Sequence, residues 1–189
     1  MPRLPPALGR AGEGRREPHD AAAGKPARAL ARAAAAASVL AASDLLTEAL
    51  PTGLGMRDLE ALTLLANHPG ATVEWLRTRV GLTQSGTVRL VDRLESVGMV
   101  HRRRTGREVG LSVTPLARRR LRSWDRARDA AMDRALAGLG PADRDVLVRL
   151  LASSLLGRPR PRPEADRTCR TCTWPRCEPG CPVDGSVPT

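Results

Sequence analysis

Aromatic residues are nearly absent from this chain of 189 residues, which has three tryptophans and no phenylalanine or tyrosine. A protein that binds single strands by stacking bases on aromatic rings needs more of them, so this class is disfavoured. The apolar core must instead be built from leucine, valine and alanine, a composition that favours helices. The sequence also has no apolar stretch long enough to cross a bilayer, which excludes a polytopic membrane protein.

Lysine is also scarce. Lys25 is the one lysine among 31 basic residues, and these outnumber the 20 acidic residues to give a formal net charge of +11. Such an excess points to a polyanionic partner, most simply a nucleic acid. Composition alone does not exclude the alternative, a soluble protein whose surface is rich in arginine and has no such partner.

Motifs of the common enzyme classes are absent from the sequence. We find no nucleophile elbow, no glycine-rich phosphate loop and no HExxH motif, and the acidic residues are scattered among arginines. We therefore expect neither an enzyme nor an organic cofactor. The alanine run over residues 33–42 is too poor in large apolar side chains for a signal peptide and predicts a helix, so we expect a cytoplasmic protein that binds no membrane.

Proline and glycine divide the chain into three parts. Residues 1–26 hold five prolines and four glycines with few large apolar side chains, so we expect a disordered tail. Residues 157–189 hold seven prolines and all four cysteines, and we expect a separate tail there. Between them, residues 27–156 carry the periodic apolar pattern of a folded domain.

The apolar spacing and the turn residues of this domain predict a mainly α-helical fold with one small β-hairpin. Thr72, Thr83 and Thr114 each precede a helical pattern and are suited to cap it, and Pro115 fits the first turn of the helix after Thr114. Thr105-Gly106 marks the hairpin turn. The expected helices cover residues 28–49, 57–68, 73–80, 84–97 and 115–137 and a last one from Pro141, and the expected strands cover residues 100–104 and 108–113.

Two of these helices, over residues 73–80 and 84–97, are joined by a short turn and followed by the hairpin. Such a helix-turn-helix can set its second helix into the major groove of DNA. The start of that helix, residues 83–87, offers hydroxyl and amide groups and free backbone N–H groups at a positive helix end, which suit phosphates and base edges. Arg89 and Arg93 lie one turn apart and can reach phosphate or guanine.

The hairpin is rich in arginine. Arg102, Arg103, Arg104 and Arg107 lie on its two strands and at its tip. An arginine at a narrow hairpin tip can enter the minor groove, where A·T-rich sequence deepens the negative potential. The alternative is that these arginines are solvated charges that keep edge strands from aggregating. Because the hairpin directly follows the predicted recognition helix, we favour contact with DNA.

The run from Gly81 to Arg119, GLTQSGTVRLVDRLESVGMVHRRRTGREVGLSVTPLARR, resembles the winged helix-turn-helix core of MarR-type transcriptional regulators. The shared features are VDRLE in the recognition helix, the stop at Gly98, the Arg102-Arg103 strand start, the Gly106-Arg107 wing and the LSVTPLAR exit into a long helix. The resemblance implies a homodimer whose dimerisation helices lie at both ends of the domain of residues 27–156.

The same resemblance implies that the following residues of the recognition helix line the major groove: Gln84, Ser85, Thr87, Val88 and Arg89. Val88 could then touch a thymine methyl group. The resemblance also implies that Arg107 is the minor-groove arginine. With the residues that the helix start and the arginine pattern add, the predicted DNA-contacting residues are Thr83, Gln84, Ser85, Thr87, Val88, Arg89, Arg93, Arg104 and Arg107.

An apolar face on the last predicted helix has no obvious partner within so small a core. Leu147, Leu150, Leu151 and Leu155 form this face, and the alanine-rich first helix is in the same position. Pairing of two copies would bury both, and a two-fold dimer would read a pseudo-palindrome with half-sites about 10 base pairs apart. Packing within one chain is the alternative.

All four cysteines lie close together in the C-terminal tail. Cys169, Cys172, Cys177 and Cys181 fall within thirteen residues, and four thiolates so spaced can hold one tetrahedral zinc ion. Neighbouring arginines would offset the negative charge of such a centre. Zinc is our first hypothesis, and a reversible thiol–disulfide switch, an iron–sulfur site and no function stay open.

The sequence thus predicts a dimeric winged-helix regulator, a repressor or an activator, that binds double-stranded DNA and responds to an effector. The effector could be a small molecule in a crevice beside the DNA-binding lobe, or a metal ion or oxidant at the cysteines. Three other functions stay open: a sensor whose main input is the cysteine tail, a non-specific basic DNA-binding protein, and a winged helix that docks on another protein.

Overall fold

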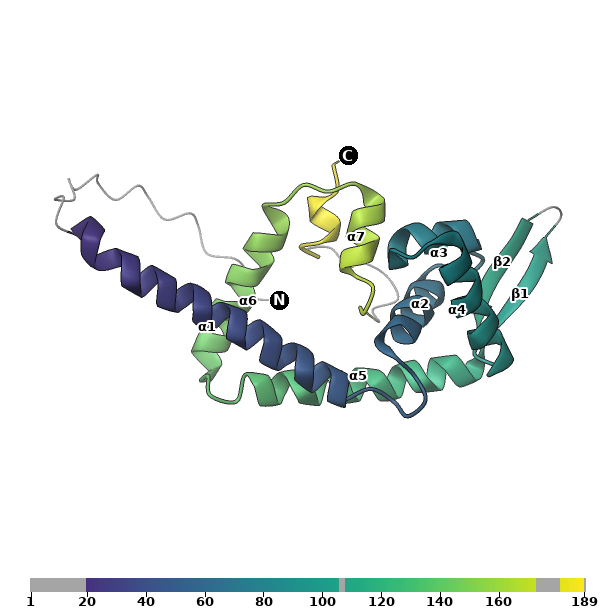
Figure 1. The fold of residues 1–189 in the computed structure, drawn as a ribbon, viewed down its shortest axis with the longest axis horizontal. Coiled ribbons are helices and arrows are strands. Elements are labelled where there is room, and N and C mark those ends of the chain that lie inside the picture. Colours follow the sequence, from purple (N-terminus) through teal and green to yellow (C-terminus); the bar gives the residue numbers. More distant parts are fainter. Residues whose placement is uncertain (1–19, 106–107, 173–180, 189) are drawn as a thin grey trace, which may run out of the picture. The chain divides into compact units, whose positions relative to one another are not determined.

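The computed structural model describes residues 20–105, 108–172 and 181–188 of the chain (Figure 1). Contacts group residues 1–40 in one compact unit and residues 41–189 in another. The described helices are α1 Asp20–Glu48, α2 Met56–Asn67, α3 Val73–Val80, α4 Gln84–Ser96, α5 Pro115–Ala135, α6 Pro141–Leu156 and α7 Arg162–Thr168, with a short 3-10 helix η1 over Asp184–Ser186. The strands are β1 Val100–Thr105 and β2 Glu108–Val113.

This mainly helical fold with a single hairpin confirms the predicted fold class. The predicted caps of α3, α4 and α5 are also confirmed. The hydroxyls of Thr72, Thr83 and Thr114 each accept a hydrogen bond of 3.1–3.2 Å from the backbone N–H three residues later. Gly81 and Gly98 end α3 and α4 with φ values of 67° and 69°, a left-handed conformation that glycine adopts without strain.

The core of the second unit is built from leucine and valine around one tryptophan. Leu59, Leu62 and Leu65 of α2 are fully buried, and Trp124 of α5 is the largest fully buried side chain. Burying one such leucine stabilises the fold by about 1.5–3 kcal/mol relative to leaving it exposed. The other elements add Leu76, Val80, Leu90, Val91, Leu94, Val100, Leu111, Val113, Ala117 and Leu121 to the same cluster.

The hairpin is a two-stranded antiparallel sheet whose register runs from Val100 opposite Val113 to Thr105 opposite Glu108. Its base is fastened to the loop between α2 and α3. The N–H of Gly70 donates to the carbonyl of Leu111, and the N–H of Leu111 donates to the carbonyl of Ala71, both at 2.8 Å. The hairpin therefore holds a fixed place beside the helix-turn-helix.

The structure differs from the sequence prediction at both ends of the domain. Residues 20–26, which we expected in a disordered tail, belong to α1, because their alanines have high helix propensity. Residues 1–19 lie outside the described range. At the other end, α7 and η1 form within the proline-rich tail of residues 157–189, and the sequence analysis named neither helix. Within the described residues, we find no helix of the length and apolar character that a membrane span requires.

Candidate nucleic-acid interface

The exposed N-terminal end of α4 carries the side chains that could read DNA. Gln84, Ser85 and Arg89 are exposed, and Val88 is half-buried. The first turn of α4 contains no acidic residue, so the positive end of the helix is not neutralised. Thr83 is exposed too, but its hydroxyl already accepts the capping hydrogen bond of α4 and lies 3.4 Å from the hydroxyl of Ser85. Its O–H donor and second lone pair are the groups that can meet DNA.

Thr87 needs a correction. We expected its side chain to line the major groove, but it is fully buried, and its hydroxyl donates to the carbonyl of Thr83 at 2.9 Å. The spacing explains this, because residue 87 lies three and seven residues before the buried Leu90 and Leu94 on the same face of α4. Thr87 therefore belongs to the core and cannot touch DNA.

Arg93 also has another role than the one expected. Its guanidinium donates two hydrogen bonds to the carboxylate of Asp58 on α2, with N–O distances of 2.8 and 2.6 Å. The Asp58 side chain is 1% exposed and also accepts from the N–H of Gly55 at 2.9 Å. This paired geometry is typical of strong arginine–carboxylate contacts and joins α4 to α2. Arg93 therefore stabilises the fold, and because its side chain is 55% exposed, its contact with DNA stays a prediction.

The arginines of the hairpin divide into two groups. Arg102 pairs with Asp92 at 2.5 Å and with Glu95, so it fastens the hairpin to α4. The pKa of Arg102 is raised above its ordinary value, mainly by the hydrogen bond with Asp92. Arg103 and Arg104 are exposed and can meet phosphates. Arg107 lies outside the described residues, so its role at the minor groove stays a prediction.

A crevice of about 150 Å³ lies between α2 and α5. The hydroxyl of Thr63 is buried at this crevice without a hydrogen-bond partner among the described residues. Such an orphaned donor is uncommon and marks a place where a ligand or water can bind. Two exposed arginines, Arg118 and Arg122, give the crevice a positive rim beside Leu121. Sequence reasoning expected a crevice beside the DNA-binding lobe but named none of its lining residues, although the i, i+4 spacing of the two arginines on α5 was a usable signal.

The cysteines are only partly described. Cys169, Cys172 and Cys181 lie in the described residues, and Cys177 lies outside them. Within the part of the chain that the structure covers, no three histidine, cysteine, aspartate or glutamate side chains converge to hold a metal ion. Zinc binding by the four cysteines together stays a prediction.

Solved structures of other proteins share this fold. YusO from Bacillus subtilis aligns with a TM-score of 0.61 at 20% sequence identity, covering 68% of this chain and 94% of YusO. The MarR family protein RV2887 of Mycobacterium tuberculosis, in complex with p-aminosalicylic acid, aligns with a TM-score of 0.53 at 23% identity, covering 61% of this chain and 91% of that chain. About a third of the present chain therefore has no counterpart in these structures.

Sequence comparison agrees with the fold. The HTH-type transcriptional regulator YdgJ of Bacillus subtilis, itself uncharacterised, is 30% identical over 104 residues, which cover 53% of this chain and 63% of YdgJ. The match thus spans less than two thirds of that relative. The model of the MarR family matches residues 52–108, which run from the start of α2 through the recognition helix into the hairpin. Over these residues, the chain is similar to the MarR family.

Proposed function

We propose that this chain is a sequence-specific DNA-binding transcription regulator that acts as a homodimer and responds to a small-molecule effector. The family consists of transcription regulators and not of enzymes, in agreement with the lack of catalytic motifs in the sequence. One observation carries the proposal: the exposed end of α4 presents Gln84, Ser85 and Arg89 beside a hairpin with exposed Arg103 and Arg104. Amide, hydroxyl and guanidinium groups are the groups that read base edges and phosphates.

A homodimer is supported by two exposed apolar surfaces, one on α6 and one on α1. On α6 no side chain is buried, and Val148, Leu150 and Leu151 are 56–63% exposed. On α1, Leu30 and Leu40 are 72% and 66% exposed. Apolar surfaces of this kind mark interaction sites in soluble proteins. A second copy of the chain would cover both and would present two recognition helices to one duplex.

Selection of bound duplexes from a random pool tests the proposal. We expect enrichment of a pseudo-palindrome with half-sites about 10 base pairs apart. A pool that stays random, with an affinity that falls steeply with salt, would instead identify a non-specific basic DNA-binding protein.

Replacing Arg89 with alanine should relax base preference at one position of each half-site. The expected loss is about 1–3 kcal/mol of discrimination, because a bidentate arginine–guanine contact would be removed. Competition of the selected duplex against single-base variants measures this. Arg120→Ala on the exposed side of α5 is the control, since it removes the same charge away from α4. An equal loss on all duplexes for both variants would contradict direct readout by Arg89.

The crevice between α2 and α5 is the proposed effector site. Its lining combines an orphaned hydroxyl and two arginines with apolar Ala66 and Leu121. Asp125 also lines the crevice, but its charge is offset by an ion pair with Arg128 at 2.9 Å. The two arginines therefore give the crevice a net positive lining, which suits a small aromatic acid. The ligand of RV2887, p-aminosalicylic acid, is a molecule of this chemical class. Occupancy of this crevice would shift the position of α2 relative to α5 and so alter operator affinity.

The double variant Arg118→Gln/Arg122→Gln should bind p-aminosalicylic acid about tenfold more weakly than the unchanged protein in calorimetric titration. The reason is the loss of a charged hydrogen bond to the carboxylate, worth about 1.5–3 kcal/mol. Arg119→Gln/Arg126→Gln is the matched control, because both residues are exposed on α5 and neither lines the crevice. Equal weakening by both pairs would show that general charge, and not this crevice, attracts the acid.

A further inference from the structure

The chain after α6 folds back on itself and forms a small ordered unit. We call residues 158–172 and 181–188 the C-terminal extension. Arg160 is 4% exposed, and its backbone N–H and guanidinium donate to the carbonyl and the hydroxyl of Ser186 at 3.1 and 3.0 Å. Ala165, in the first part of the extension, and Val183, in the second, are also buried. The short helix η1 contacts α6. The two limbs of the extension are therefore tied together.

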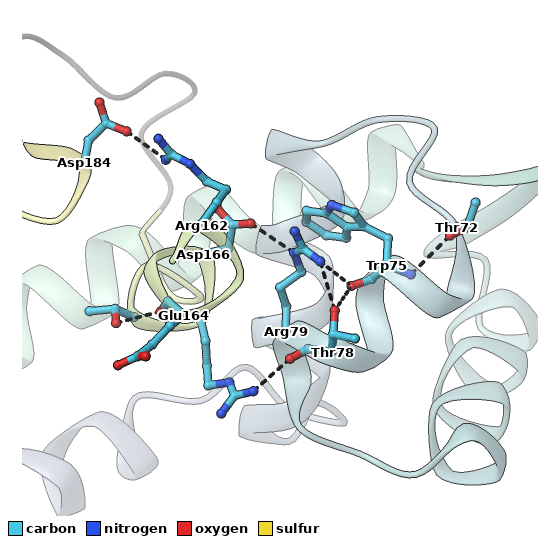
Figure 2. A network of polar contacts seen from close by, with 10 residues as sticks. Thr72, Trp75, Thr78, Arg79, Arg162, Glu164, Asp166 and Asp184 are labelled. Atoms are coloured by element: carbon cyan, nitrogen blue, oxygen red, sulfur yellow. Dashed lines mark hydrogen bonds and ion pairs between the residues drawn. The ribbon is translucent and has the colours of Figure 1, made fainter. Parts of the chain in front are cut away.

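The extension docks on α3, the first helix of the helix-turn-helix (Figure 2). The guanidinium of Arg79 donates to the carboxylate of Asp166 on α7 at 3.0 Å, and their side chains are only 12% and 8% exposed. Arg79 is held from a second side because it lies over the ring of Trp75 at 4.2 Å. Arg167 adds a hydrogen bond of 2.9 Å to the carbonyl of Thr78.

The extension also reaches α2 and α5. Arg170 donates to the carboxylate of Glu60 at 2.8 Å, and the Glu60 side chain is 6% exposed. The carbonyls of residues 171 and 172 accept hydrogen bonds of 3.0 Å from Arg128 on α5 and Asn67 on α2. Asn67 also lines the crevice between these helices. The docked segment therefore touches α3 and both helices that line the proposed effector site.

These contacts are specific, because both ion pairs have a carboxylate that is nearly inaccessible to water. A buried charge that loses its partner is strongly destabilised, so docking through Asp166 is sensitive to single substitutions. Glu60 also pairs with Arg57 at 2.8 Å, so loss of Arg170 removes one of its two partners. Helix α7 has seven residues, too few for a helix that is stable alone in water. Its order therefore depends on docking, and protection of its amides reports docking directly.

The extension begins one residue beyond the end of α6, after the C-cap Gly157. Helix α3 is thus connected to α6 by two routes, one along α5 and one across the extension. A helix-turn-helix that is connected to α6 at two points rotates less relative to α6 than one that is connected at a single point. Restricting both lobes of a dimer in advance lowers the entropy lost when they meet one duplex.

We propose that the C-terminal extension is an intrachain strut that holds the helix-turn-helix in its operator-binding position through the Arg79–Asp166 and Arg170–Glu60 pairs. The proposal rests on the proposed function, since it concerns regulation of the same DNA-binding surface. A chemical change at Cys169 or Cys172 would then act on the DNA-binding surface through docking, because residues 169–172 belong to the docked part.

The double variant Asp166→Asn/Arg170→Gln tests the strut in the full-length chain. It removes one negative and one positive charge, so the net charge stays at +11. Hydrogen–deuterium exchange of the α7 amides should speed up about tenfold or more as docking weakens. Affinity for the selected operator should fall about fivefold to twentyfold, while affinity for random duplex stays within about twofold because it follows charge.

The matched control is Glu164→Gln/Arg158→Gln, which makes the same chemical changes in the same segment. Both side chains are exposed, and neither forms a side-chain contact across to α2 or α3 among the described residues. We expect this control to match the unchanged protein in both measurements.

Three results would overturn the strut. They are unchanged exchange in α7, faster exchange with unchanged operator affinity, and a rise in operator affinity, which would make the extension inhibitory. A protein that prefers no duplex at all would instead refute the proposed function, and the exchange measurement would still report docking. The two failures are therefore distinguishable.

Discussion

Replacing Arg93 with alanine is expected to lower the free energy of unfolding by about 2 kcal/mol. The substitution leaves the carboxylate of Asp58 buried, with the N–H of Gly55 as its remaining hydrogen-bond donor among the described residues. Loss of one partner of a fully buried ion pair costs about 3–5 kcal/mol. Arg93 itself is 55% exposed, so water screens part of the interaction and the expected value is lower. Urea unfolding at one fixed protein concentration measures the change.

Arg89→Ala is the matched control for this experiment. Arg89 lies one turn before Arg93 on α4, is exposed, and forms no ion pair among the described residues. Its replacement should change the free energy of unfolding by less than about 0.5 kcal/mol while it relaxes base preference. If Arg93→Ala kept full stability and lost base preference instead, Arg93 would be a DNA contact and our assignment to the fold would be wrong.

The elements that the sequence predicts well are those with local causes. Thr72, Thr83 and Thr114 cap their helices as expected, because a cap needs only its own side chain and an N–H three residues later. Gly81 and Gly98 end helices for an equally local reason. The burial of Thr87 could also have been predicted, since its spacing to Leu90 and Leu94 places it on the inner face of α4. We predicted a DNA contact instead because its side chain carries a hydroxyl.

The features that the sequence does not predict depend on residues far apart in the chain. The partner of Arg93 is Asp58, 35 residues earlier, and the partner of Asp166 is Arg79, 87 residues earlier. No periodicity or cap signals such a pair. Helix α7 was missed for this reason, because its seven residues include a proline and no apolar stripe, and its stability comes from docking. The crevice depends on how α2 packs against α5, which spacing along either helix does not fix.

Replacing Trp124 with alanine is expected to cost about 3–5 kcal/mol of unfolding free energy, the largest effect of any single substitution proposed here. Trp124 is fully buried and is the largest side chain of a core otherwise built from leucine, valine and alanine. These small side chains are already packed and cannot collapse into the space that an indole leaves. Urea unfolding measures the loss, and Ser123→Ala on the exposed side of α5 should change stability by less than about 0.5 kcal/mol.

Trp124→Phe separates packing from hydrogen bonding at the same site. The indole N–H of Trp124 is buried and has no hydrogen-bond partner among the described residues. Phenylalanine keeps a ring and removes this unpaired donor, so it should cost about 1 kcal/mol, well below the loss for alanine. A phenylalanine variant as unstable as the alanine variant would show that the N–H is paired in solution. The stability that Trp124 provides would then come from a hydrogen bond and not, as we argue, from the volume that it fills in the core.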